Sequence, residues 1–73
     1  MEYVLNGDSF GKKLMHYRKK RGLTRLKLAA MAEISVFDLI DMENGVLRTI
    51  PAELVRKFCE LLDTNVENLL NEP

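Results

Sequence analysis

The segment that most constrains the fold runs from residue 22 to residue 45 and contains two short apolar patterns separated by a turn. Thr24 precedes the first pattern and Ser35 precedes the second. A hydroxyl at such a position satisfies a free backbone N–H in the opening turn of a helix. Asn44 and Gly45 close the second pattern with a helix stop signal. The apolar residues at helical spacing are Leu28, Met31, Ala32, Leu39 and Met42. This order predicts two short helices joined by a tight turn.

Helical patterns of the same kind flank this segment on both sides. Asp8 or Ser9 is placed to cap a first helix, which Gly22 ends. Pro51 suits the first turn of a fourth helix, and Asn65 is placed to cap the last one. The five predicted helices span residues of about 8–21, 24–32, 35–43, 51–62 and 66–71. Because the connections are short, sequential helices should pack as neighbours, and we expect an all-α fold, a compact five-helix bundle.

The first seven residues carry a different pattern. The apolar run Tyr3-Val4-Leu5 is followed by Asn6-Gly7, a turn dipeptide. A short strand at this place would be a template for pairing with a second subunit. We favour the alternative that residues 1–7 are an arm or a short extended segment packed on the core. Residues 8–73 then form a single domain, near the lower size limit for a core that folds unaided.

The composition excludes several classes of protein. The 73 residues are 47% apolar and 30% charged, which is ordinary for a globular chain. No apolar run approaches the roughly 20 residues of a membrane span, and the N-terminus lacks the order of a secretion signal, so we expect a cytoplasmic protein. The single cysteine, Cys59, cannot form an internal disulfide, and the single histidine has no candidate partner. We therefore expect no metal, no cofactor, no small-molecule substrate and no enzyme activity.

Charge is distributed unevenly along a chain whose net charge is zero. Residues 1–33 carry eight Lys and Arg against three acids, a net charge of +5. Residues 34–73 carry three Lys and Arg against eight acids, a net charge of −5. Such asymmetry fits a nucleic-acid-binding face or a charge-complementary partner. Two solvated helix faces of opposite sign explain it at least as well.

The span from about Phe10 to Leu70 resembles the phage-repressor and Cro-like helix-turn-helix family. The markers that carry the resemblance are Tyr17-Arg18, Gly22-Leu23-Thr24, Leu28-Ala29, Ile34-Ser35, Leu39, Met42-Glu43-Asn44-Gly45 and Val66-Glu67-Asn68-Leu69-Leu70. Each marker is weak alone, whereas their joint order and spacing are specific for the fold. The resemblance implies a sequence-specific DNA-binding transcriptional regulator, which binds double-stranded DNA as a homodimer.

The resemblance also assigns roles to individual residues. Arg18 and Glu43 occupy positions that commonly form a structural ion pair, and Ala29 lies where a small residue lets two helices approach. Arg25 replaces a usual Gln, and a guanidinium can still bind phosphate. The other positions at which relatives meet DNA phosphates are occupied by Thr24, Ser35, Asn44 and Arg48.

The base-reading positions of the second motif helix are occupied by Val36, Phe37 and Asp41, which depart from the polar residues usual in relatives. The two apolar side chains can touch thymine methyl groups, and the carboxylate can accept from a cytosine amine. Glu33 is a further departure, because it stands at a turn position usually taken by Gly. A left-handed backbone there would cost about 1 kcal/mol.

The same outward face supports a second hypothesis, a protein-binding module such as an antirepressor or a regulatory partner. Val36, Phe37 and Ile40 would form an exposed apolar patch rimmed by Asp38 and Asp41. An apolar centre with a polar rim is typical of protein interfaces. We place DNA binding ahead of this alternative because it is the usual function of the scaffold.

Overall fold

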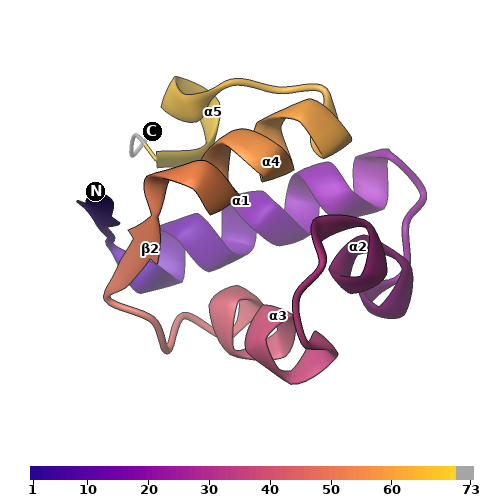
Figure 1. Ribbon diagram of the computed structural model, residues 1–73, viewed down its shortest axis with the longest axis horizontal. Helices are drawn as coiled ribbons and strands as arrows, with labels where there is room; N and C mark the ends of the chain where they lie inside the picture. The colour runs from indigo at the N-terminus through magenta and orange to yellow at the C-terminus, as the bar shows by residue number, and fades with distance from the viewer. Residues whose placement is uncertain (71–73) are drawn as a thin grey trace.

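A computed structural model describes residues 1–70 and confirms the all-α, five-helix architecture (Figure 1). The elements are β1 (Glu2–Val4), α1 (Gly7–Lys20), α2 (Arg25–Ala32), α3 (Val36–Glu43), β2 (Thr49–Pro51), α4 (Ala52–Leu62) and α5 (Val66–Leu70). The expected helix boundaries agree with these to within one residue; residue 71, the expected end of the last helix, lies outside the described residues. Within residues 1–70, no helix is long and apolar enough to cross a membrane.

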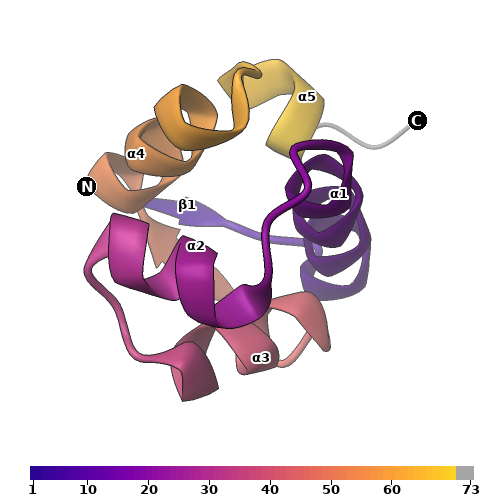
Figure 2. The ribbon, with the colours of Figure 1, turned by 90° about the vertical axis from the view of Figure 1, so that its right-hand side faces the viewer.

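The other four helices lie around α1 as two pairs. In Figure 1, α4 and α5 lie above α1, and α2 and α3 lie below it. Figure 2 shows α1 at the right, with α2 beneath α4. α1 packs against both α3 and α5, and α2 packs against α3 and α4. The side chains that form the shared core are Phe10, Leu14, Leu28, Ala29, Ala32, Leu39, Met42, Ile50, Val55, Phe58, Leu62 and Leu69. One continuous core therefore holds α2 and α3 in a fixed relation.

The buried side of α2 differs from the expected one at Met31. Its side chain is 38% exposed, and Ala29 is buried together with Leu28 and Ala32. α2 is covered by α3 on one side and by α4 on the other. The face that turns inward is therefore the one with two alanines, because small side chains let neighbouring helices approach closely.

The helix caps agree with the sequence in three cases and differ in one. The side chains of Thr24, Ser35 and Asn65 accept hydrogen bonds from backbone N–H groups one turn into α2, α3 and α5. The prediction of Asp8 or Ser9 as the cap of α1 is wrong. Asn6 caps α1, and its Oδ1 accepts from the backbone N of Ser9 at 3.2 Å. The turn dipeptide Asn6-Gly7 thus also begins the helix, because an Asn side chain serves a turn and a cap equally well.

Residues 1–7 contain an ordered strand that pairs within the chain. β1 is antiparallel to β2, with Tyr3 opposite Ile50 and Val4 opposite Thr49. The backbone N–H of Leu5 donates to the carbonyl of Arg48 at 2.8 Å and extends the ladder. Tyr3 packs against the core and Val4 is exposed, as the period of two in a strand requires. β2 was not predicted, because Pro51 suits the first turn of the helix that follows and was assigned to that helix.

α1 and α3 approach each other closely at a helical glycine. A Cβ placed on Gly11 would lie 2.6 Å from the backbone oxygens of both Met42 and Glu43. No side chain fits there, so glycine is required although it weakens a helix interior. This contact fixes the C-terminal end of α3 against α1.

Candidate nucleic-acid interface

The N-terminal ends of α2 and α3 are both capped and open to solvent. Thr24 Oγ1 accepts from the backbone N of Lys27 at 3.1 Å, and Ser35 Oγ accepts from the backbone N of Phe37 at 3.1 Å. Both cap residues are exposed. Each cap satisfies one N–H of its helix, so the other N–H groups of the first turn remain available to an anion and the helix dipole favours negative charge there. The two ends therefore have the chemistry of phosphate sites.

Exposed cations accompany the start of α2 and the loop after α3. Arg25 and Lys27 lie in the first turn of α2, and Arg48 precedes β2. All three are exposed. Asn44, the C-cap of α3, is also exposed and presents an amide at the opposite end of that helix. The residues expected at phosphates thus lie on the surface, at the ends of α2 and α3.

A buried ion pair joins α1 to the inner side of α3. Arg18 donates from Nε to Oε2 of Glu43 at 2.6 Å and from the terminal Nη2 to Oε1 at 3.1 Å. The two residues are only 7% and 5% exposed. Arg18 also donates from Nη1 to the carbonyl of Leu23 at 2.8 Å, which fixes the connection between α1 and α2. The pair expected from the family resemblance is therefore a structural clamp between three elements.

Glu43 has a second cationic partner that sequence reasoning missed. Arg25 donates from Nε to Glu43 Oε1 at 3.0 Å, while its side chain remains 43% exposed. The terminal nitrogens of Arg25 have no hydrogen-bond partner among the described residues. The buried carboxylate thus orients an exposed guanidinium whose outer edge is free. The signal in the sequence was the presence of Arg25 where relatives usually have Gln. Unlike Gln, Arg carries a guanidinium that can bond to Glu43 through Nε and still present its terminal nitrogens to a phosphate.

The outward face of α3 is less apolar than the sequence suggested. Phe37 is 75% exposed. Val36 and Ile40 are half-buried, and Val36 packs against the core. The expected three-residue apolar patch is therefore reduced to the exposed ring of Phe37, because Val36 and Ile40 are partly covered and Val36 packs against the core. Asp38 and Asp41 are both exposed beside it.

The turn between α2 and α3 contains a left-handed residue, Glu33, at the position where relatives usually have Gly. Glu33 has φ 60° and ψ 41°, and its backbone N–H donates to the carbonyls of Ala29 and Ala30 at the end of α2. This conformation favours glycine. The turn is thus strained by its side chain, although its hydrogen bonds are those of an ordinary helix end.

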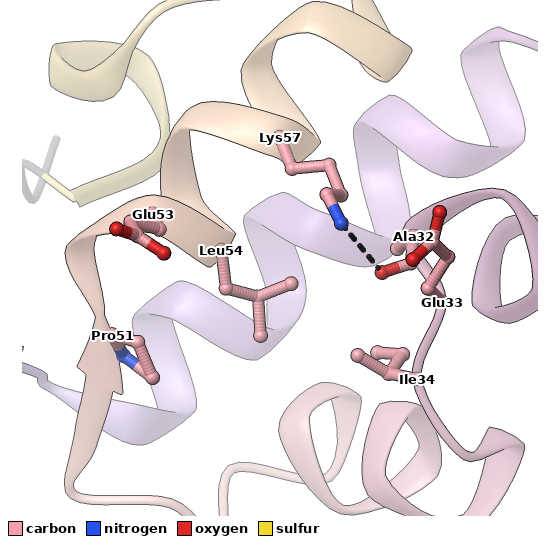
Figure 3. Close-up of a pocket in the computed structure, with 7 residues that line it drawn as sticks. All are labelled: Ala32, Glu33, Ile34, Pro51, Glu53, Leu54 and Lys57. Atoms are coloured by element: carbon pink, nitrogen blue, oxygen red, sulfur yellow. Dashed lines mark hydrogen bonds between the residues drawn. The ribbon is translucent and has the colours of Figure 1, made fainter.

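A hollow of about 280 Å³ lies between this turn and α4 (Figure 3). Lys57 reaches across from α4 and donates to the carbonyl of Ala32 at 3.3 Å, which satisfies one of the last carbonyls of α2. The remaining charged side chains of the lining are the carboxylates of Glu33 and Glu53. Two carboxylates and an ammonium that is already bonded are a poor match for phosphate, so the hollow is not part of the interface.

Metal and thiol chemistry are not supported at any described residue. Within residues 1–70, no group of three or more His, Cys, Asp or Glu side chains is placed to hold a metal ion. Burial raises the pKa of the Cys59 thiol above its usual value. A raised pKa leaves less of the reactive thiolate at neutral pH, so Cys59 acts as a packing residue on α4.

Comparison with known proteins identifies the class to which this fold and interface belong. A family model for a helix-turn-helix of the Cro/C1 type matches residues 14–69. The chain belongs to this family, and the match supports a DNA-binding regulator rather than an enzyme. A comparison with curated protein sequences gave no significant match.

Solved structures of regulators share the fold. The clp gene regulator ClgR of Corynebacterium glutamicum is 26% identical, with a TM-score of 0.80 over 89% of this chain and 82% of that one. The master regulator for biofilm formation SinR, solved in complex with DNA, is 25% identical, with a TM-score of 0.77 over 82% of this chain and 95% of that one. The restriction-modification controller C.AhdI of Aeromonas hydrophila is 22% identical, with a TM-score of 0.77 over 86% and 94%, and shares the fold.

Proposed function

We propose that this chain is a sequence-specific DNA-binding transcriptional regulator that places α3 in the major groove of double-stranded DNA. The observation that carries the proposal is the joint exposure of two capped helix N-termini, together with exposed cations at the start of α2 and in the loop after α3. A helix in the major groove with its N-terminal residues at the bases, and a preceding helix crossing the backbone, is the docking mode of this motif. Membership of the Cro/C1-type family supports the same assignment.

The phosphate contacts in this proposal come from the helix ends and the loop after α3. Thr24 and Ser35 offer backbone N–H groups, and Asn44 offers its amide. Arg25 and Arg48 supply positive charge, and Arg25 is held in place by Glu43 at 3.0 Å. A guanidinium fixed through Nε presents its outer nitrogens in a fork suited to a phosphate. Affinity therefore rests on these groups, whatever the sequence of the DNA.

We also infer that the functional unit is a homodimer. α3 has eight residues, so one copy reaches only a few base pairs of the groove. Two copies on half-sites one helical turn apart combine two modest affinities, and a two-fold symmetric protein requires a palindromic site. Analytical ultracentrifugation of the DNA complex should give two chains for each duplex. One chain for each duplex at saturation would refute this inference.

The salt dependence of DNA binding tests the proposed phosphate contacts. Fluorescence anisotropy of a mixed-sequence duplex pool gives the slope of log affinity against log salt. The slope for Arg48→Ala should be shallower than that for the wild type by about 0.9, because one phosphate contact is lost. Arg56→Ala is the matched control, since Arg56 is an exposed arginine on α4, a helix that contributes no residue to the proposed interface. Equal slopes for the two variants would contradict the placement of the interface.

A protein-binding role for α3, in an antirepressor or regulatory partner, remains the second candidate because Phe37 is 75% exposed. An aromatic side chain with this exposure is a typical anchor in protein interfaces. If duplex DNA does not bind even at about 50 mM salt, this candidate replaces the first. Phe37→Ala together with Ile40→Ala should then abolish capture of the partner while the helical circular dichroism stays unchanged.

A further inference from the structure

Asp41 presents an exposed carboxylate that nothing in the fold explains. Among the described residues, its side chain forms no salt bridge and no hydrogen bond. The other acid of this face, Asp38, lies in the first turn of α3, where the helix dipole favours negative charge. Asp41 lies beyond that turn and has no such compensation. On a helix that faces DNA phosphates, its carboxylate is repulsive unless a base donates a hydrogen bond to it.

The major-groove edges of the four bases restrict which base can do so. Guanine presents only acceptors and thymine presents an acceptor and a methyl group, so neither donates to a carboxylate. Adenine has a donor amine, but its N7 acceptor lies beside that amine and would repel the carboxylate. Cytosine offers its N4 amine with no acceptor of its own at the same edge. Cytosine is therefore the base that suits Asp41.

Phe37 adds an apolar contact next to this carboxylate. Residues 37 and 41 are four apart on one helix, so their Cβ atoms lie about 5–6 Å from each other on the same face. Phe37 is 75% exposed, whereas Val36 and Ile40 are half-buried. The apolar feature of the major groove is the C5 methyl group of thymine. Successive bases of a strand are about 3.4 Å apart, within the combined reach of the two side chains.

We propose that α3 reads two adjacent pyrimidines, with the Asp41 carboxylate accepting from the N4 amine of a cytosine and the Phe37 ring contacting the C5 methyl group of a neighbouring thymine. This inference rests on the proposed DNA-binding function and names its target. No side chain on the outward face of α3 before Asn44 is an amide or a cation, the usual readers of guanine and adenine. The protein should therefore recognise its half-site through an adjacent cytosine and thymine on one strand.

Selection followed by base analogues tests the inference. The full chain is used to select duplexes from a library with a randomised central segment, and a cytosine next to a thymine should be enriched. Replacing that thymine by deoxyuridine removes only the methyl group and should lower affinity about fourfold. Replacing the cytosine by a 2-pyrimidinone nucleoside removes only the N4 amine and should lower affinity about tenfold or more.

Two pairs of variants assign these losses to the side chains. Phe37→Ala should abolish the difference between thymine and uracil duplexes, whereas Val4→Ala, which also truncates an exposed apolar residue, should keep it. Asp41→Asn should remove the discrimination for cytosine, because an amide both donates and accepts. Asp38→Asn removes the same charge from the same helix and should raise affinity without changing the preferred base.

The outcomes separate this inference from the function on which it rests. Equal binding of thymine and uracil duplexes, or a selected site without cytosine, overturns the inference while salt-dependent DNA binding still supports the function. The same loss of cytosine discrimination in Asp38→Asn and Asp41→Asn overturns the role given to Asp41. Absence of any salt-dependent binding overturns both the function and the inference.

Discussion

The inner and outer faces of α3 differ in whether their side chains contact the rest of the fold. The inner face buries Leu39, Met42 and Glu43, and Glu43 pairs with Arg18 at 2.6 Å. The outer face presents Phe37, Asp38 and Asp41 to solvent, and none of their side chains has a hydrogen bond or an ion pair among residues 1–70. One face of this eight-residue helix therefore holds it to the rest of the fold, and, within the described part of the chain, the side chains of the other face form no bond that stabilises the fold.

This difference shows where the information about function lies. The inner face agrees with the family pattern, and its contacts to α1 and α2 explain every residue in it. The outer face departs from the pattern and is unexplained by packing, so its residues are free to be chosen by what the protein binds. Changes on the inner face should therefore cost stability, and changes on the outer face should cost only binding.

The largest expected effect comes from breaking the buried ion pair. Glu43→Ala should lower the free energy of unfolding by about 3–5 kcal/mol or abolish cooperative unfolding, because it leaves Arg18 buried without its counter-charge. Chemical denaturation followed by circular dichroism measures this. Arg25→Ala serves as the control, since its side chain is 43% exposed and an exposed pair is worth at most about 1 kcal/mol. A loss below about 1 kcal/mol for Glu43→Ala would show that the inner face is not what holds α3.

A smaller loss is expected where α1 meets the end of α3. Gly11→Ala should destabilise by about 1–3 kcal/mol, because the added Cβ would lie 2.6 Å from two backbone oxygens of α3. Helix propensity alone predicts a gain of about 1 kcal/mol from the same change. The sign of the change in the denaturation midpoint therefore decides between packing and propensity, and a stabilised variant would contradict the close approach.

Relief of strain in the turn should give a modest gain. Glu33 has φ 60°, so Glu33→Gly should stabilise by about 1 kcal/mol, which thermal denaturation can detect. Asp63 also has a positive φ of 54° at the end of α4, and Asp63→Gly provides a second instance at the end of another helix. If neither substitution raises stability, the left-handed geometry is not costly here.

The smallest effect on stability is expected on the outer face of α3. Phe37→Ala should change the free energy of unfolding by less than about 0.5 kcal/mol, because the ring is 75% exposed. The denaturation midpoints of wild type and variant should coincide. A loss of more than about 1 kcal/mol would mean that Phe37 supports the fold and that the two faces are not distinct.

Much of the fold could be predicted from the sequence because local signals and the core pattern agree. The caps Thr24, Ser35 and Asn65 and the stop at Gly22 placed four of the five helices to within one residue. The two strands could not be predicted in the same way. Three-residue strands carry almost no periodic signal, and their pairing depends on contacts between segments nearly fifty residues apart.

The sequence placed the candidate interface residues on their helices and loops, but it did not predict how exposed each of them is. The exposure of Phe37 follows from its place on α3, whereas the half-burial of Val36 depends on its packing against the core. The contact between Arg25 and Glu43 needs two residues 18 apart and a side-chain conformation that no local pattern encodes. The exposure of these residues and the contacts between them therefore depend on tertiary packing, which local sequence patterns do not encode.

The measurement that tests the central claim most directly is the affinity of the full chain for a mixed-sequence DNA duplex at about 50 and about 200 mM salt. Fluorescence anisotropy should show binding at the lower salt and a loss of at least about tenfold at the higher salt, since the proposed interface brings Arg25 and Arg48 to phosphates. The absence of binding at the lower salt would contradict the account, and the outer face of α3 would have to be reassigned to a protein partner.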